Sequence, residues 1–386
     1  MKNRKICVVI TARPTYSRVK TALMAIDRHQ DLELQLVIAG SALVDRYGSV
    51  VDIIEQDGFV IRDKVFVVLE GENQRSMAKT TGLAVIELSN TFYNLKPDAV
   101  MVIADRFETI SISIAASYQN IPLIHLQGGE VTGNIDEKVR HANTKLADLH
   151  LVASEEAKNR VIRMGEDPDF VINTGCPSID LAMTLPKSKD LLFDPIEKYG
   201  GVGEIGDWKS GYLVVLQHPV TTEYRESRHH IKNTLEAIND LNIPTFWFWP
   251  NIDSGADGTS NGIRSFRELH KPKNIRFFKN MGPTDFLQLL RHSQCLIGNS
   301  SVGIRECAFL GVPVVNIGSR QNRRERAANV IDVPYDKASI IEGIQNRLEV
   351  KNGSESSAIY GNGNSGNYIA EILAKVPLRF HKTIMY

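Results

Sequence analysis

The stretch DAVMVIADRFETISISIAASYQNIPLIHLQGGE (98–130) contains two buried-strand patterns with a helical segment between them. Each strand pattern is a short apolar run that ends in a polar cluster or in glycines, as in DAVMVIAD and IPLIHLQGG. Apolar runs that alternate with helical segments are typical of parallel strands whose sheet is covered on both faces. The stretch therefore predicts a βα unit of a parallel sheet.

The same pattern recurs in two series. The first series is KICVVIT, LELQLVIAG, DAVMVIAD, IPLIHLQGG, DLHLVAS and DFVINTG, and the second is GYLVVLQHP, IPTFWFWPN, NIRFFKN, QCLIGNSS and VPVVNIGS. A chain of 386 residues is long for one hydrophobic core, since single cores stop growing at roughly 250–300 residues. Between the series, TGCPSIDLAMTLPKSKD (174–190) loses strand character, so we expect two α/β domains with a boundary near residue 176.

The composition is that of a globular protein with balanced charge. The chain has 42% hydrophobic and 23% charged residues and a formal net charge of zero, which does not suit nucleic acid as a partner. The apolar run after the basic N-terminus ends at Ile10, so we predict no signal peptide, and no run predicts a membrane span. The four cysteines lie far apart without a C-x-x-C pair, which favours reduced thiols and a cytoplasmic location over a metal or redox site.

One glycine pattern resembles a dinucleotide-binding fingerprint but occurs in the wrong context. Gly361, Gly363 and Gly366 form G-x-G-x-x-G, yet the fingerprint must follow a strand and open a full βαβ unit, and only one helical segment follows here. We therefore predict a tight loop before a closing helix and no nicotinamide cofactor.

Polar residues that follow a strand of a parallel sheet lie at the edge where such sheets bind ligands. In the first half, Glu130 stands on a glycine-flanked loop and is a candidate for acid–base chemistry. Asn134 and Glu137 are spaced as an N-cap and its capping-box partner, so Glu137 is predicted to be structural. Asp136 either contributes to the site or pairs with Arg140 across one helical turn.

Asp105 follows six consecutive apolar residues and allows two interpretations. It is either the N-cap of the next helix, with Glu108 as capping-box partner, or a second carboxylate beside Glu130. Two carboxylates at adjacent strand ends can have their pKa values pushed apart, as an acid–base pair requires.

A first anion site is predicted after the first strand. Arg13 comes directly after that strand, and Ser17 and Arg18 enter the following helix. Arginine together with helix-terminal amides binds anions, although a surface arginine would fit the sequence equally well.

A second anion site is predicted in the second half. Asn299, Ser300, Ser301 and Gly303 form a small strand-to-helix turn whose amides suit phosphate oxygens. Glu306 follows, either as an acceptor for ribose hydroxyls or as a helix-dipole partner. Arg320, Arg323, Arg324 and Arg326 form a charge run that is either a solvated face or, at Arg320, a cation for a diphosphate.

His218 ends a strand and is followed by Pro219. It is either a proton donor to a leaving phosphate or an ordinary strand-end residue. Together these residues predict a nucleotide-diphosphate site on the second half and carboxylates on the first.

Several motifs in this order resemble the hydrolysing UDP-N-acetylglucosamine 2-epimerases, including the epimerase half of the animal bifunctional epimerase/kinase. The motifs are ADRFE (104–108), HLQGGEVTGNIDEKVRHANTKLA (125–147), LQHPVTTE (216–223), PNIDSG (250–255), IGNSSVGIRE (297–306), IGSRQ (317–321) and IYGNGN (359–364). The resemblance implies an α/β GT-B fold with two Rossmann-like domains and an interdomain cleft. It places them at 1–176 and 177–365, with a C-terminal helix at 366–386 that returns to the first domain.

The resemblance also implies roles for individual residues. Those matching UDP-binding positions are Arg13, Ser300, Ser301, Glu306 and Arg320. Those matching catalytic positions are Asp105, Asp136 and His218, and those matching substrate contacts are Arg106 and Asn251. The implied reaction removes the proton at sugar carbon 2 with loss of UDP and then adds water to give N-acetylmannosamine, without metal or cofactor. A homo-oligomer, dimer or tetramer, is expected.

Gln127 departs from the animal motif H-x-E-G-G-E, because an amide replaces a carboxylate regarded there as catalytic. Since an amide is no base near neutral pH, either Glu130, Asp105 or Asp136 does that work, or Gln127 only orients the sugar. Three other functions stay open: a hydrolysing 2-epimerase of UDP-2,4-diacetamido-2,4,6-trideoxyglucose, a GT-B glycosyltransferase, and a non-catalytic UDP-sugar sensor.

Overall fold

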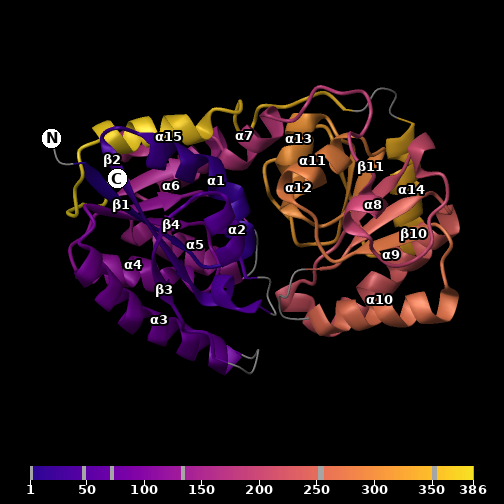
Figure 1. Cartoon of the computed structure of the whole chain (residues 1–386), viewed down its shortest axis with the longest axis horizontal. Helices are drawn as coiled ribbons and strands as arrows, with labels where there is room; N and C mark the ends of the chain where they lie inside the picture. The colour runs from indigo at the N-terminus through magenta and orange to yellow at the C-terminus, as the bar shows by residue number, and fades with distance from the viewer. Residues whose placement is uncertain are drawn as a thin grey trace. The chain divides into compact units, whose positions relative to one another are not determined.

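The computed structural model describes residues 3–45, 49–69, 74–131, 135–250, 256–349 and 354–385. Within these ranges the chain forms two compact α/β units, each built on its own parallel sheet (Figure 1). The first unit comprises 3–131, 135–183 and 360–385, and the second comprises 184–359.

The first unit contains a seven-stranded sheet in the order β3-β2-β1-β4-β5-β6-β7, and all neighbouring strands run parallel. Its strands are β1 (Arg4–Ile10), β2 (Leu32–Ala39), β3 (Ile61–Val65), β4 (Ala99–Ile103), β5 (Leu123–Leu126), β6 (Leu149–Val152) and β7 (Val171–Asn173). Its helices are α1 (Arg13–Arg28), α2 (Val51–Gln56), α3 (Gln74–Leu95), α4 (Thr109–Tyr118), α5 (Ile135–Leu146), α6 (Glu155–Arg163), α7 (Pro177–Met183) and α15 (Ser365–Lys375).

Helices cover both faces of this sheet because alternate side chains of each central strand point to opposite faces. In β1, Ile6 and Val8 pack into the same apolar cluster as residues of α1 and α15. Cys7 and Val9, the residues between and after them, pack into a second cluster with residues of α3 and α4. Both faces are therefore apolar, which explains the uninterrupted hydrophobic run of the sequence.

The first unit extends beyond the predicted boundary near residue 176 because α7 packs on it. Thr21 of α1 donates its hydroxyl to the carbonyl of Pro177 and to Oδ2 of Asp180, both at 3.0 Å. The Asp180 carboxylate also accepts the backbone amides of Ser365 and Gly366 at 2.8 and 2.7 Å, at the start of α15. α7 thus links α1 to the returning C-terminal helix, the yellow helix of Figure 1.

The second unit contains a six-stranded parallel sheet in the order β10-β9-β8-β11-β12-β13. Its strands are β8 (Leu213–Leu216), β9 (Thr245–Phe248), β10 (Ile275–Phe278), β11 (Cys295–Gly298), β12 (Val314–Ile317) and β13 (Val330–Val333). Its helices are α8 (Pro195–Tyr199), α9 (Ser227–Leu241), α10 (Ala256–His270), α11 (Pro283–Arg291), α12 (Ser301–Ile304), α13 (Glu306–Leu310) and α14 (Lys337–Leu348).

In each sheet, the order of the strands across the sheet first runs backward and then forward along the sequence. The reversal lies between β1 and β4 in the first unit and between β8 and β11 in the second. Ligands of open parallel sheets bind outside the carboxyl ends of the strands at such a switch point. The loops that follow these four strands are therefore where chemistry is expected.

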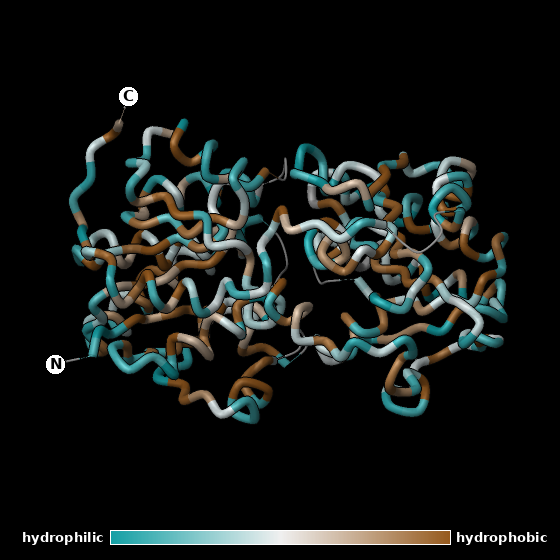
Figure 2. Tube along the Cα trace, turned by 90° about the horizontal axis from the view of Figure 1, so that it is seen from above, coloured by the Kyte–Doolittle hydropathy of each residue, from teal (hydrophilic) through white to brown (hydrophobic). Residues whose placement is uncertain are grey.

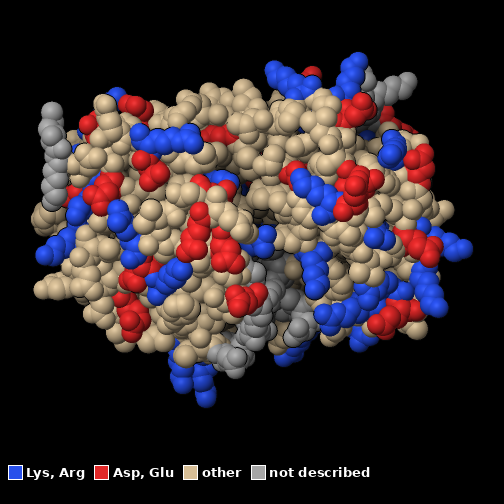
Figure 3. All heavy atoms as spheres, in the orientation of Figure 1, with Lys and Arg blue, Asp and Glu red and all other residues tan. Residues whose placement is uncertain are grey.

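Hydrophobic stretches run through the interior of each unit, and hydrophilic stretches lie at its outer loops (Figure 2). Acidic and basic side chains are interspersed on the visible face of each unit (Figure 3). Within the described ranges, no helix has the length and hydropathy required to cross a membrane.

Candidate functional site

A buried arginine organises the carboxyl edge of the first sheet. Arg140 of α5 has a side chain that is 1% exposed. Its guanidinium donates to Oδ2 of Asp105, in the loop after β4, and at 2.7 Å to the backbone carbonyl of Glu130, in the loop after β5. One cation therefore fixes α5 and two strand-end loops relative to one another.

The glycine pair before Glu130 brings the chain close to α6. Gly129 has φ +77°, and a Cβ atom there would lie 2.3 Å from the carbonyl oxygen of Ala157. Only glycine fits this close approach in a left-handed conformation. It lets the loop turn so that Glu130, whose side chain is buried, stays beside Arg140.

The capping interpretation of Asp105 is wrong. α4 begins at Thr109 and its N-cap position is Glu108, without a side-chain capping hydrogen bond. Glu108 instead accepts from Nε of Arg106 at 2.9 Å. The Asp105 carboxylate, 18% exposed, belongs to the Arg140 cluster, and this favours the functional interpretation.

Gln127 is held between two other side chains. It is 1% exposed and has φ +67°. Its Oε1 accepts from Nη1 of Arg18 at 3.2 Å, and its Nε2 donates to Sγ of Cys176 at 3.0 Å. Cys176 lies 3.0 Å from the hydroxyl of Ser178. The amide therefore orients Arg18, and the loop after β5 is joined to α1 and α7.

The other candidates of the first unit lie around the same edge. Arg13 is the first residue of α1 and Ser17 follows one turn later, both partly buried. Asp136 lies in the first turn of α5 and is partly buried. Glu137, predicted to be structural, contacts His141 one turn along the helix at 3.4 Å. Asn134 and Asn251 lie outside the described residues.

In the second unit, the side-chain amide of Asn299 holds the backbone of His218 through two hydrogen bonds. The backbone amide of His218 donates to Oδ1 of Asn299 at 2.7 Å, and Nδ2 of Asn299 donates to the carbonyl of His218 at 2.8 Å. These residues follow β8 and β11, on either side of the switch point. Gly298 permits this approach, because with φ +135° a Cβ atom would lie 2.1 Å from the Leu216 carbonyl oxygen.

The predicted diphosphate residues surround the same turn. The Ser300 hydroxyl accepts the amide of Val302 at 3.4 Å and caps α12, which Ser301 begins. Arg320 donates from Nη1 to the Asn299 carbonyl at 3.2 Å. Glu306 begins α13, and its Oε2 is buried without a hydrogen-bond partner in the described part of the chain. The structure thus groups the four predicted residues around the end of β11: Ser300, Ser301, Glu306 and Arg320.

In the portion of the chain that the structure describes, no three His, Cys, Asp or Glu side chains gather in a way that could hold a metal ion.

Comparison with known proteins agrees with this arrangement. Residues 24–374 match the family model described as UDP-N-acetylglucosamine 2-epimerase. The chain belongs to the UDP-N-acetylglucosamine 2-epimerase family. Its relatives include the hydrolysing UDP-N,N'-diacetylbacillosamine 2-epimerase of Legionella pneumophila, 33% identical over 97% of both chains. They also include the polysialic acid biosynthesis protein P7 of Escherichia coli, 36% identical over 88% of this chain and 85% of that one.

Solved structures of the epimerase family share the fold. The UDP-N-acetylglucosamine 2-epimerase of Neisseria meningitidis, bound to UDP-N-acetylglucosamine, superposes with a TM-score of 0.78 at 21% identity, over 96% of this chain and all of that one. The Methanocaldococcus jannaschii enzyme gives 0.79 at 18% identity, over 96% and 99% of the chains. The two parallel-sheet domains are thus the GT-B-like fold of this family, and the predicted fold class is confirmed.

Two positioning contacts in this epimerase-family chain were not predicted from its sequence. For Arg140 the sequence offered only a possible pair with Asp136, and Asn299 was expected only to bind phosphate. A third is made by His125, to which the sequence assigned no role. Burial lowers the pKa of His125 to about 3, although the hydrogen bond to Ala104 opposes this. The neutral ring therefore donates from Nε2 to the Ala104 carbonyl at 2.9 Å and accepts the Thr144 hydroxyl at Nδ1 at 3.0 Å.

Proposed function

We propose that this chain is a hydrolysing UDP-N-acetylglucosamine 2-epimerase that converts UDP-N-acetylglucosamine and water into N-acetylmannosamine and UDP, in nonulosonic (sialic) acid biosynthesis. The observation that carries the proposal is the Asp105 carboxylate fixed by buried Arg140. The same helix, α5, carries Asp136 one turn away. A carboxylate held by a buried cation, with a second carboxylate on the helix that carries the cation, suits the transfer of a carbon-bound proton.

The second unit supplies the nucleotide groups in this proposal. Glu306 accepts the ribose hydroxyls, for which its buried Oε2 is available among the described residues. Arg320 and the backbone amides after Asn299 take the charge of the diphosphate. Arg13, Ser17, Arg18, Arg106 and Asn251 are proposed as further substrate contacts.

The proposed reaction has two steps. In the first, a carboxylate removes the proton at sugar carbon 2 while the bond from carbon 1 to the UDP oxygen breaks, which leaves an unsaturated sugar and UDP. His218 donates a proton to the departing phosphate. In the second step, water adds its hydroxyl to carbon 1 and carbon 2 is protonated on the opposite face, which gives the manno configuration. Asp105 and Asp136 share the proton transfers, and Glu130 supports them.

A second substrate is favoured by the names of two relatives. The Legionella pneumophila protein and a Campylobacter jejuni protein, each 33% identical to this chain, are named as 2-epimerases of N,N'-diacetylbacillosamine nucleotides. That sugar is 2,4-diacetamido-2,4,6-trideoxyglucose, which has the same acetamido group at carbon 2. The elimination chemistry is identical, so only the groups that contact carbons 4 and 6 would differ.

The test is turnover of each UDP-sugar alone in deuterium oxide, with products identified by NMR. The proposal requires UDP and free N-acetylmannosamine that carries deuterium at carbon 2. Faster turnover of the diacetamido sugar would assign that substrate instead. Protium retained at carbon 2 with the gluco configuration would mean simple hydrolysis, a requirement for an acceptor would indicate a glycosyltransferase, and binding without turnover would indicate a sensor.

A further inference from the structure

The residues after α15 form a strap, 376–385, that crosses the loop between α6 and β7. Arg379 donates to Oδ2 of Asp167 at 2.9 Å, and its guanidinium carbon lies 3.3 Å from the centre of the Phe170 ring. The amide of Met385 donates to the Gly165 carbonyl at 2.9 Å. The strap is thus attached at both ends, and Lys382 lies between these two attachments.

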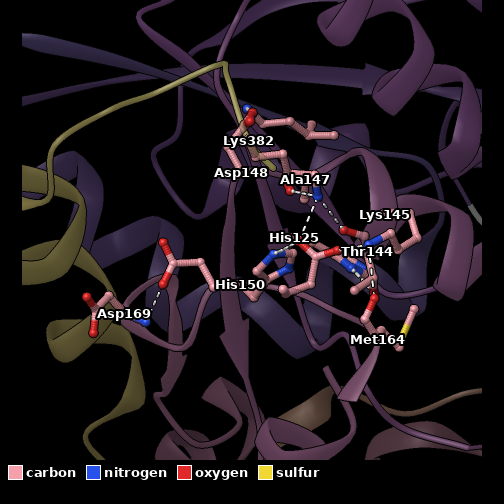
Figure 4. Close-up of polar contacts among 12 residues, drawn as sticks. His125, Thr144, Lys145, Ala147, Asp148, His150, Met164, Asp169 and Lys382 are labelled. Atoms are coloured by element: carbon pink, nitrogen blue, oxygen red, sulfur yellow. Dashed lines mark hydrogen bonds and ion pairs between the residues drawn. The ribbon is translucent and has the colours of Figure 1, made fainter. Parts of the chain in front are cut away.

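Lys382 enters a buried polar cluster at the C-terminal end of α5 (Figure 4). Its Nζ lies 2.6 Å from the Ala147 carbonyl, 3.4 Å from the Thr144 carbonyl and 2.7 Å from Oε2 of Glu166. A lysine there satisfies carbonyls that have no partner inside the helix and complements the negative end of its dipole.

Glu166 is the centre of this cluster, with a side chain that is 3% exposed. It accepts from Nζ of Lys145 at 2.5 Å and contacts Nε2 of His150 at 3.0 Å as well as Lys382. Burial alone would raise the pKa of Glu166, but hydrogen bonds from His150, Lys145 and Lys382 outweigh it and lower that pKa to about 2. The carboxylate is therefore ionised at neutral pH, and it opposes the burial that lowers the pKa of Lys382.

The other end of α5 carries the proposed catalytic groups. Thr144, whose carbonyl Lys382 contacts, binds His125 through its hydroxyl, and His125 in turn binds the carbonyl of Ala104, the residue before Asp105. Arg140, one turn earlier, holds Asp105 itself. A continuous set of contacts thus runs from the strap along α5 to the Asp105 loop.

We propose that Lys382 is a positioning residue for the reaction: the strap fixes α5 so that Arg140, Asp105 and Asp136 keep the geometry that proton transfer requires. This rests on the proposed function. A helix that carries reacting groups must be held to within a fraction of an ångström, and a shift of about 1 Å caused by a distant change costs up to about 100-fold in rate. The hydrogen bonds of the strap described above go to Asp167, Gly165, Glu166 and the carbonyls at the end of α5, none of which is proposed to bind UDP, so we expect nucleotide affinity to be independent of the strap.

The test compares Lys382→Met, which keeps the length of the side chain without its charge, with Lys382→Arg. The matched control is Lys375→Met, which removes an exposed pair with Glu371 on α15. We expect Lys382→Met to lower kcat by about 10-fold to 100-fold with UDP affinity within twofold of wild type. Lys382→Arg restores most of the rate, and Lys375→Met leaves it unchanged. The amide hydrogens of α5 should also exchange faster in Lys382→Met than in the wild type. This measurement does not depend on enzymatic activity.

A Lys382→Met enzyme with normal kcat, or one in which kcat and UDP affinity fall together, would overturn the proposal. If Lys382→Met does not fold, Arg379→Ala replaces it, because this change loosens the strap at the partly exposed pair of Arg379 and Asp167. The same comparison of kcat with UDP affinity then decides. An inactive wild type would refute the proposed function. In that case, faster amide exchange of α5 in Lys382→Met than in the wild type would still support the structural role of the strap. Equal exchange in the two proteins would refute it.

Discussion

The side chain of Asn299 holds the backbone of His218 from both sides: it accepts the His218 amide at 2.7 Å and donates to the His218 carbonyl at 2.8 Å. Asn299 is fully buried and His218 is 6% exposed, so water cannot replace these bonds easily. The position of His218, the proposed proton donor to the departing phosphate, is therefore set by a residue in the loop after another strand, β11.

Asn299→Ala should lower both stability and turnover. The buried amide and carbonyl of His218 would lose their partner, which costs about 1–3 kcal/mol of unfolding free energy. Turnover should fall at least about 10-fold, because the proton donor is displaced. Urea unfolding and steady-state kinetics measure the two effects.

Asn274→Ala is the matched control, since Asn274 also contacts backbone at Gly206 and Asn242 but lies in another loop of the second unit. The kcat of Asn274→Ala should equal that of the wild type. Equal kcat for both alanine variants would remove Asn299 from the positioning of His218.

Arg140→Met should abolish most turnover while UDP still binds. The Asp105 carboxylate would lose its buried guanidinium, and removal of a positioned acid or base costs about 10²–10⁴ in rate. If Arg140 acts through Asp105, the double variant Arg140→Met/Asp105→Asn should be no slower than Asp105→Asn alone. Strictly multiplicative losses in this cycle would show that the two residues act independently.

Gln127→Glu should change turnover by less than about tenfold, the range of a residue that orients other groups. The new carboxylate would keep the contact with Arg18 but could not donate to Cys176. Asp136→Asn, as the comparison, should lose about 10²–10⁴ in rate. A large gain of activity in Gln127→Glu would mean that a base belongs at this position and that the wild type works without it.

Glu306→Ala and Arg320→Ala should each weaken binding of UDP itself by about 1.5–3 kcal/mol, the value of a lost charged hydrogen bond. Isothermal titration calorimetry with UDP measures this without any need for turnover. Arg276→Ala provides a control, because Arg276 contacts the carbonyls of Gly200 and Gly203. Unchanged UDP affinity in either test variant would remove that residue from the nucleotide site.

The sequence predicted the central strands of both sheets and the edge strands β7 and β10, but not the edge strands β3 and β13. Both strands are mostly partly exposed; β3 is the polar segment IRDKV (61–65), and β13 is the short segment VIDV (330–333), which Asp332 interrupts, so no long apolar run marks either strand. Local spacing offered Asp136, one helical turn away, as a possible partner for Arg140, but it gave no sign that the guanidinium binds Asp105, which is 35 residues distant. Contacts between strand-end loops depend on the sheet order, which a single sequence does not contain.

Stability should fall steadily as the pH drops below 6.5, because two buried histidines resist protonation in the folded state. Burial lowers the pKa of His125 from 6.5 to about 3, and burial likewise lowers that of His150, with the opposing influence of Glu166. Below pH 6.5 these histidines bind protons in the unfolded chain but stay neutral in the folded chain. Each histidine therefore lowers the free energy of unfolding by an amount that approaches about 1.4 kcal/mol per pH unit, until its folded pKa is reached. Glu166 adds a further loss between pH 4.5, its ordinary pKa, and about 2.

Urea unfolding at a series of pH values from 7.5 to about 4.5 measures this dependence. His150→Gln removes one titrating group and should give a shallower slope than the wild type. A free energy of unfolding that stays constant between pH 6.5 and pH 4.5 would contradict the neutral state of His125. It would mean that Nδ1 of His125 gains a proton in this range and can no longer accept the Thr144 hydroxyl.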